Sequence, residues 1–576
     1  MAQAKQDMGS GSVKKLMLQL MIPAVVAQVV NLLYNIVDRI YIGHIAGIGA
    51  AALTGVGLFT PILMLLNAFA MLVGAGGAPR AAIAMGQEDR QQAEKIISNS
   101  FTVLMFFAVV LTIGFYAGAP TLLRMFGASD TTLPYALSYS RIYILGSVFV
   151  LLVLGMNPFI TTQGFAKTSM LTTVIGAVIN IILDPILIFG AGLGVRGAAI
   201  ATVLSQAVGA AWILRFLTGK KTLLRLRKDY LRPEKQVILP VMALGISTFV
   251  MLSTESLLSI SFSSSLARYG GDVAVGAMTV ITSASQLCTL PIQGICQGGQ
   301  PVTSFNFGAG KKSRVKEAFR FQLTLCGVYT CVFWLLMMLV PSAAAGIFTS
   351  DSTLISYTTW AMRIYMAGIF AMGFQIGCQQ TFMALGQAKI SLLLACLRKI
   401  ILLIPLIFIL PHVVSDPVFG VFLAEPVSDI LAATITTFTF FTRFDRILDK
   451  GAARVGPRPP EPANVLRAFA GSFVLPGDAP SSASLHPAGR CPRLPCPKPF
   501  RNLLKLLQTC SFFLAQFSQA SLLFSVFSPP GLDAVSFSRY NGTVQSKLCV
   551  FATLKMRCFT GIPGNIGTTS GNFQFF

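Results

Sequence analysis

The chain has 576 residues, of which 54% are hydrophobic and only 11% are charged, and its formal net charge at pH 7 is +23. Because soluble globular domains carry about 25% charged residues, this composition excludes an ordinary soluble protein and favours one that crosses a membrane many times. The mean hydropathy of +0.70 agrees. The polar residues 1–14 do not resemble a cleavable signal, so we expect the first apolar segment to remain as a spanning helix.

Long apolar runs predict the elements of the chain, since about 20 apolar residues cross a bilayer as a helix. In chain order we expect helices near residues 16–42, 50–76, 96–118, 134–158, 168–190, 196–217, 238–262, 272–298, 317–341, 356–380, 390–411 and 417–442. The expected fold class is therefore an all-α polytopic membrane protein with 12 transmembrane helices.

Basic residues gather in alternate loops between these helices. The basic loops include Lys14, Lys15, Arg90, Lys95, Lys220, Lys221, Lys311, Lys312, Arg443 and Arg446. Basic loops stay in the cytoplasm. Both ends of the helical core are therefore expected to be cytoplasmic, as an even number of helices requires.

A repeated phrase indicates that the helical core is duplicated. "SRIYILG" at 140–146 returns as "MRIYMAG" at 362–368, 222 positions later. Three weaker pairs follow at offsets of 222–224: 164–171 with 386–393, 84–90 with 308–314, and 197–202 with 420–425. Each half holds six helices, and because six is even, both halves enter the membrane in the same direction. We expect two parallel-repeat six-helix lobes with a substrate site between them.

The pattern divides the chain into five parts. They are a cytoplasmic N-terminus (1–15), an amino lobe (16–217), a basic cytoplasmic linker (218–237), a carboxy lobe (238–445) and a basic tail rich in Pro and Ser (446–576). The tail has no repeat partner and is expected to be disordered or non-native. Our hypothesis is that it is out-of-frame or read-through sequence, and the alternative is a basic tail that binds anionic lipid.

Two acids, Asp38 and Asp184, lie inside predicted helices of the amino lobe, where a charge costs at least about 2.5–3.5 kcal/mol. Asp38, Asp184 and Thr202 lie roughly 7–9 Å below the outer ends of their helices, at ~1.5 Å per residue. They would thus share one level of the membrane. Carboxylate and hydroxyl oxygens suit Na⁺, and two neighbouring carboxylates suit a proton carrier. The alternative is that these groups only tie helices together by hydrogen bonds.

Polar neighbours line the same helix faces. Spacings of three and four residues place Gln28, Asn31 and Asn35 on the face of Asp38, and Asn180 on the face of Asp184. Asn180 is therefore expected beside Asp184, where its amide oxygen could take part in the same site. The other three residues would line the cavity or the substrate path.

The carboxy lobe does not repeat the pair of acids. It carries Glu255 in its first helix, and Glu425 and Asp429 one turn apart in its last helix. Glu425 occupies the repeat position of Thr202, and Arg398 and Lys399 lie in the helix before. We expect these acids to line the cavity. Glu255 would either bind a cationic drug or pair with a basic residue of a neighbouring helix.

The motifs "QVVNLLYNIVDRIYIGHIAG" (28–47), "NIILDPILIFG" (180–190) and "GVRGAAIATVLSQ" (194–206), with the paired G-x-A-K turns, resemble the multidrug and toxic compound extrusion (MATE) family in its prokaryotic DinF/MepA-like branch. The resemblance covers about residues 15–445. It implies two six-helix bundles, a central V-shaped cavity and export of drug-like, often cationic compounds in exchange for Na⁺ or H⁺.

The resemblance also implies a role for individual residues and a cellular location. The positions that match Asp38, Asn180, Asp184 and Thr202 form the amino-lobe cation site of the family. We expect a monomer in the bacterial plasma membrane, with lipid and small molecules as its partners and no nucleic acid. We expect no cofactor beyond the coupling ion, and no metal site beyond one for Na⁺.

Other classes of function fit the sequence less well. There are only three histidines, and no HExxH, P-loop, GxSxG or CxxC spacing occurs, so we expect no catalytic residues and no enzyme activity. A flippase for lipid-linked precursors, from the same superfamily, remains an alternative. A non-transporting membrane receptor or scaffold is another.

Overall fold

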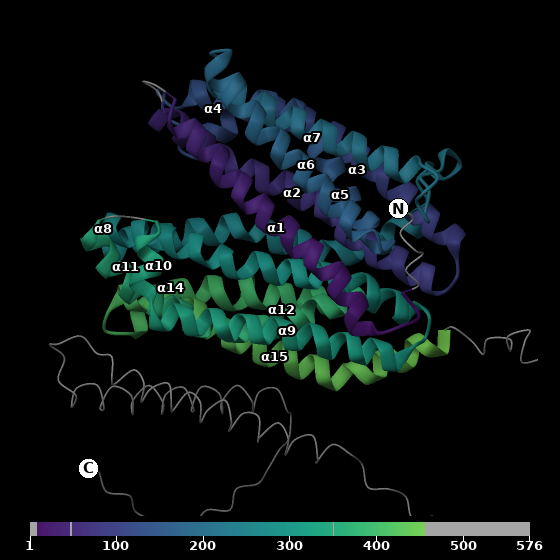
Figure 1. The fold of residues 1–576 in the computed structure, drawn as a ribbon. Helices are drawn as coiled ribbons and strands as arrows, with labels where there is room; N and C mark the ends of the chain where they lie inside the picture. The colour runs from purple at the N-terminus through teal and green to yellow at the C-terminus, as the bar shows by residue number, and fades with distance from the viewer. Residues whose placement is uncertain (1–7, 46–48, 349–350, 455–576) are drawn as a thin grey trace, which may run out of the picture. The chain divides into compact units, whose positions relative to one another are not determined.

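The computed structural model describes residues 8–45, 49–348 and 351–454, and this part of the chain is built of helices with no strand (Figure 1). The predicted tail falls almost wholly on residues 455–576, which lie outside the described residues. The amino half contains α1 (Val13–Gly43), α2 (Gly49–Gly86), α3 (Arg90–Met125), α4 (Leu133–Leu145), α5 (Ser147–Thr162), α6 (Ala166–Pro185), the π-helix η1 (Ile186–Gly190) and α7 (Val195–Thr218).

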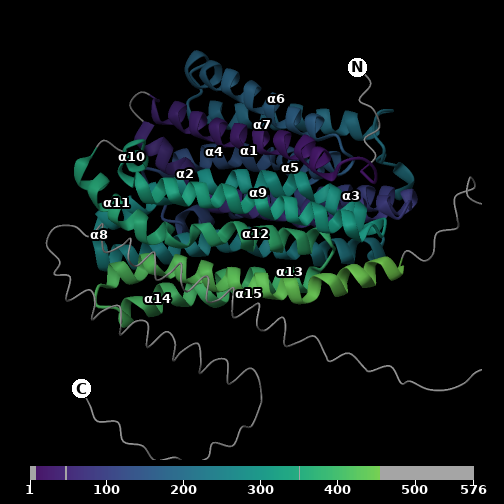
Figure 2. The same ribbon diagram turned by 60° about the horizontal axis from the view of Figure 1, so that its bottom comes forward.

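The carboxy half follows a short 3₁₀-helix, η2 (Lys228–Tyr230). It contains α8 (Lys235–Gly308), α9 (Lys312–Leu339), α10 (Pro341–Gly346), α11 (Ser352–Tyr365), η3 (Met366–Gly368), α12 (Ile369–Ala384), α13 (Ala388–Cys396), the π-helix η4 (Leu397–Leu403), α14 (Ile404–Val413) and α15 (Pro417–Arg454). In both views α6 and α7 lie on one side of these helices and α15 on the other (Figures 1 and 2).

The described residues account for the twelve predicted spans. Ten helical segments are long and apolar enough to cross a membrane, and α4 with α5 forms an eleventh span that is bent by 55°. The 74-residue α8 contains two spans, because the backbone of Gly271 is not helical (φ 65°, ψ −163°). The prediction of a twelve-helix membrane fold is confirmed.

The last helix is longer than the sequence predicts. The predicted last span ends at residue 442, whereas α15 continues to Arg454. Ion pairs of 2.7 Å from Lys316 to Asp445 and from Lys312 to Asp449 hold this extension against the start of α9. Hydropathy detects only the apolar part of such a helix, so it placed the end too early.

The structure repeats itself as the sequence predicts. Helices α1 and α8, α3 and α9, α5 and α12, α6 and α13, and α7 and α15 each begin 222 residues apart. The repeated glycines lie at the break between α4 and α5 and in η3, before α12. A Cβ at Gly146 would overlap the side chain of Val203, and one at Gly368 would lie 2.7 Å from Cα of Pro426. The motif around Arg-Ile-Tyr and the following glycine occurs in both lobes because each lobe needs a glycine at this close contact between helices.

The linker between the halves is bound to the amino lobe. The side-chain Oε1 of Gln163 accepts hydrogen bonds of 2.8 Å from the backbone N–H groups of Leu223 and Leu224. Asn99 Oδ1 accepts one of 2.6 Å from the N–H of Glu234, immediately before α8. The buried carboxylate of Glu94 pairs with Arg227 at 2.7 Å. The linker is therefore part of the amino lobe rather than a loose connection.

Helix α1 contacts both halves of the molecule (Figure 1). Near its start, Met17 and Met21 pack in one apolar cluster with Val302 and Ala318 of the carboxy half. Its later part packs against α6, and the ring of Tyr41 contacts that of Phe189. The start of α1 therefore packs on the carboxy lobe, and the part of α1 that contains Asp38 packs on the amino lobe.

Candidate cation site

Asp38 and Asp184 meet inside the amino lobe. Asp38 comes from α1 and Asp184 from the last turn of α6, and their carboxyl groups lie close enough to interact electrostatically. Asp184 is completely buried. Two carboxyl groups can form a hydrogen bond only if one of them carries a proton, because an ionised carboxylate only accepts. The shared depth predicted from the sequence therefore corresponds to a shared site.

Asn180 and Thr202 complete the arrangement. The amide nitrogen of Asn180 donates to Oδ1 of Asp184 at 3.3 Å and to the hydroxyl of Thr202 at 3.4 Å. The Thr202 hydroxyl in turn donates to the carbonyl of Ala198 at 3.0 Å. The structure thus brings together all four residues that were predicted for the cation site.

Oxygen atoms without a partner lie among these residues. Asp38 Oδ1, Asp184 Oδ2 and Asn180 Oδ1 are buried and accept no hydrogen bond from the described part of the chain. Buried polar atoms are normally paired, so such a group of acceptors indicates a place for a proton or a small cation. The described residues contain no cluster of three His, Cys, Asp or Glu side chains that would hold a metal ion.

The local backbone explains how α6 presents its polar groups. Asn180 and Asp184 stand one turn apart on the same face, and Pro185 follows without an N–H to donate. The chain then widens into the π-helix η1. Such π segments are frequent at functional sites because they shift side chains relative to a regular helix.

Three tyrosines at this site were missed in the sequence. Tyr34 of α1 and Tyr143 of α4 interact electrostatically with Asp38, and Tyr139 of α4 lies beside Thr202. The ring of Phe59 packs edge-on against Tyr139 and Tyr143. Their spacing could have indicated them, because Tyr34 lies one helical turn before Asp38, and Tyr139 and Tyr143 lie one turn apart on the same face of α4.

The other predicted residues of α1 form their hydrogen bonds outside this group. Gln28 donates to Oε1 of Gln297 in the carboxy half at 3.0 Å. Asn35 bonds the carbonyl of Asn31 at 2.6 Å, within α1. Their role at a cavity stays a prediction.

The carboxy-lobe acids are held by two basic residues of η4. Arg398 pairs with Glu425 at 3.2 Å and with Asp429 at 2.8 Å. Lys399 pairs with Glu255 and also donates to the carbonyl of Met251 at 2.9 Å. Of the two alternatives for Glu255, pairing with a basic residue is therefore present in the structure.

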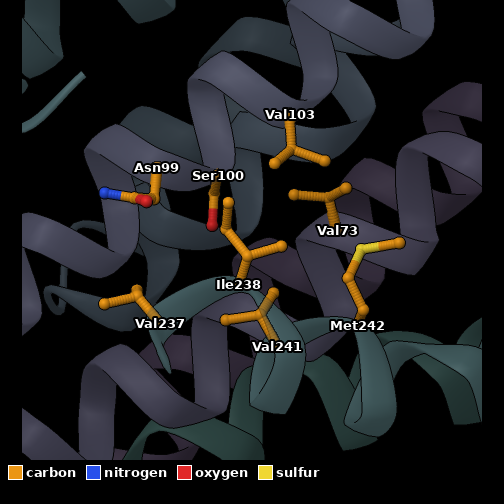
Figure 3. A pocket seen from close by; sticks show the side chains of 8 residues that line it. All are labelled: Val73, Asn99, Ser100, Val103, Val237, Ile238, Val241 and Met242. Carbon is orange, nitrogen blue, oxygen red and sulfur yellow. The ribbon is translucent and has the colours of Figure 1, made fainter. Parts of the chain in front are cut away.

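A small pocket lies elsewhere, where α2 and α3 meet the start of α8 (Figure 3). Its lining includes Val73, Ser100, Val241 and Met242, and the space that a water-sized sphere can occupy between them is about 0 Å³. Sites for drug-sized ligands measure about 300–1,000 Å³. This pocket is too small for such a compound.

Curated relatives resemble this chain over nearly their full length. "Multidrug export protein MepA" of Staphylococcus saprophyticus is 24% identical over 426 residues, which cover 74% of this chain and 93% of that protein. The protein of the same name from Staphylococcus haemolyticus is 25% identical over 429 residues, with the same coverage.

Solved structures share the fold. A structure described as the outward-facing conformation of a multidrug resistance MATE family transporter matches with a TM-score of 0.72 at 24% identity. A MOP superfamily transporter from Pyrococcus furiosus matches with a TM-score of 0.73 at 23% identity. Each match covers 78% of this chain and 99% of the other. A model of the MatE family matches residues 23–186 and 247–409, once in each half, and the chain therefore belongs to the MatE family.

Proposed function

We propose that this protein is a multidrug efflux transporter that exports drug-like compounds, often cationic, in exchange for a cation held by Asp38 and Asp184. Membership of the MatE family and the similarity to multidrug export proteins support the transport role. The observation that carries the exchange mechanism is the close approach of the buried Asp184 carboxyl group and the half-buried Asp38 carboxyl group, beside oxygen atoms that have no partner in the described residues.

The physical basis is the cost of charge inside a membrane. Two ionised carboxylates side by side repel each other and lose their hydration, so binding a positive ion relieves both penalties. Release becomes favourable when the site opens to a side where the ion is scarce. The closeness of Asp38 and Asp184 favours H⁺ as the ion, because a proton fits between the two carboxyl groups. Na⁺ with Asn180 and Thr202 as further ligands is the second candidate.

We infer the orientation from the basic residues. Lys15, Lys235 and Lys312 lie at the starts of α1, α8 and α9, so this end of the molecule, called the basic end below, would face the cytoplasm of a bacterium. The plasma membrane is the proposed location, and a monomer the proposed state.

Transport by the purified full-length chain in proteoliposomes tests the proposal. Ethidium movement is followed while a pH gradient or a Na⁺ gradient is imposed separately. We expect the pH gradient to drive transport, and Asp38→Asn and Asp184→Asn to abolish the coupling. Asp130→Asn is the matched control, because the Asp130 side chain is fully exposed in a loop. Full coupled transport by either site variant would refute the assignment, and transport driven only by Na⁺ would identify the other ion.

A further inference from the structure

The carboxy lobe contains an ionic group, buried except for one carboxylate, that the mechanism above does not use. We call it the carboxy-lobe cluster, and its members are Glu255 of α8, Arg398 and Lys399 of η4, and Glu425 and Asp429 of α15. An ionic group of this size inside a membrane segment is costly and therefore indicates a function.

The residues of the carboxy-lobe cluster belong to the helices that correspond, in the repeat, to those that form the cation site. The first part of α8, the α13–α14 run and α15 correspond to α1, α6 and α7. The register is fixed by packing, because Gly197 lies against the backbone of Leu187 and Gly420 against that of Leu410. Both pairs are 223 residues apart, and the same step relates Thr202 to Glu425.

A tyrosine accompanies the acids in each lobe. Tyr143 interacts electrostatically with Asp38, and its repeat partner Tyr365 interacts in the same way with Glu425 and Asp429. The two lobes therefore build their polar groups on one plan. The difference is that the carboxy lobe supplies its own cations, Arg398 and Lys399.

The charges of the carboxy-lobe cluster do not balance. Three carboxylates face two cations, so the group is one positive charge short when all five are ionised. Glu425 Oε1 pairs with Arg398, while its Oε2 is buried and has no hydrogen-bond partner among the described residues. An uncompensated charge in this setting is strongly unfavourable. One further positive charge would complete the group.

The pair of Glu255 and Lys399 is asymmetric in its exposure. The side chain of Glu255 is 48% exposed, whereas that of Lys399 is only 5% exposed. A carboxylate with so much free surface in a membrane segment must face water or a ligand rather than lipid. A ligand can therefore approach Glu255 from the side opposite to Lys399.

We propose that the carboxy-lobe cluster binds one organic monocation at the exposed side of Glu255. The ammonium group of Lys399 competes with this cation, because it pairs with the same carboxylate when no ligand is bound. The choice of an organic cation rests on the proposed function. On binding, the ammonium group of Lys399 leaves Glu255 and turns to Oε2 of Glu425. Without the ligand, a proton on Glu425 supplies the missing charge, and this proton is released to water when the cation binds.

The other groups around the carboxy-lobe cluster keep their charge in this exchange. Arg398 remains paired with Asp429. Tyr365 of α11, and Cys288 of α8, which interacts with Asp429, stay neutral. One positive charge enters and one proton leaves, so the total charge of the group is constant.

The test is equilibrium binding of tetraphenylphosphonium to the purified full-length chain, without any gradient. The chain carries Asp38→Asn and Asp184→Asn, so that the amino-lobe acids release no protons. Calorimetry in buffers with different ionisation enthalpies counts the protons released. We expect about one proton for each cation bound near neutral pH. Binding with no proton released, or no binding at all, would overturn the proposal.

Substitutions at the pair separate competition from a structural role. Lys399→Gln should tighten tetraphenylphosphonium binding by about tenfold, because the competitor is gone, and Lys399→Arg should leave it nearly unchanged. Glu255→Gln should weaken binding about tenfold and cancel the gain from Lys399→Gln. A purely structural lysine would give weaker or unchanged binding in Lys399→Gln, and that result would refute the competition. These outcomes do not depend on whether the transport assay succeeds.

Discussion

The carboxyl group of Asp184 lies close to that of Asp38, although α6 and α1 are far apart in the chain. The two groups approach each other in the interior of the amino lobe, where Asp184 has no exposed surface. A pair of acids in such a place lowers the stability of the lobe when both are ionised. The predictions below begin with this relationship.

Asp184→Asn is expected to abolish coupled transport without unfolding the protein. The amide has the shape of the carboxyl group but no charge to bury, so Tm should be unchanged or higher by up to about 3 °C. Thermal unfolding in detergent measures this. A marked fall in Tm would instead support the alternative in which Asp184 only ties helices together.

Gly146→Ala is expected to destabilise the amino lobe by about 1–3 kcal/mol, because the new methyl group overlaps the side chain of Val203. Gly114→Ala in α3 is the matched control, since a Cβ there meets no other atom within 4 Å. Thermal unfolding of the two variants in the same detergent is the measurement. Equal stability of both would contradict the close packing at Gly146.

Glu94→Gln is expected to loosen the linker. The carboxylate of Glu94 is only 3% exposed and pairs with Arg227, and its loss would leave residues 219–234 less firmly held. Limited trypsin digestion should then cut the linker faster, since this segment carries several Lys and Arg residues. Glu317→Gln on the exposed face of α9 is the control and should be cut at the parental rate. An unchanged cutting rate in Glu94→Gln would argue against the proposed anchoring.

Arg314→Gln is expected to release the segment before α1. Arg314 donates to the carbonyl of Gly11 at 2.7 Å and to that of Ser10 at 3.1 Å, which fixes the start of α1 on the carboxy lobe. Hydrogen exchange of residues 8–17 should become faster in this variant. Lys15→Gln removes a neighbouring exposed charge and serves as the control. Parental protection in Arg314→Gln would mean that apolar packing alone holds the segment.

The sequence was sufficient for the features that depend on composition and repetition. Apolar runs located the twelve spans, and "SRIYILG" with its copy revealed the duplication because each lobe needs a glycine at the same contact. Asp38 and Asp184 could be found because charge is rare in a membrane segment. Their common depth followed from counting residues along the helices.

Other features depend on contacts that no local pattern records. Tyr34, Tyr139 and Tyr143 were missed because aromatic residues are ordinary constituents of membrane helices. The sequence left open whether Glu255 binds a drug or pairs with a basic residue, because its partner Lys399 in η4 lies far from it in the chain. The end of α15 was misplaced because ion pairs, rather than apolar residues, hold its last turns.

The attachment of the linker determines where the two halves can move relative to each other. Asn99 binds the N–H of Glu234, and α8 begins at the next residue. No flexible segment therefore separates the part of the linker that is fixed to the amino lobe from the first helix of the carboxy lobe. Any rotation must therefore be absorbed within the first turns of α8, where Pro240 already removes one helical hydrogen bond. The covalent connection thus acts as a short pivot, and it restricts the lobes to rotation about a point at the basic end.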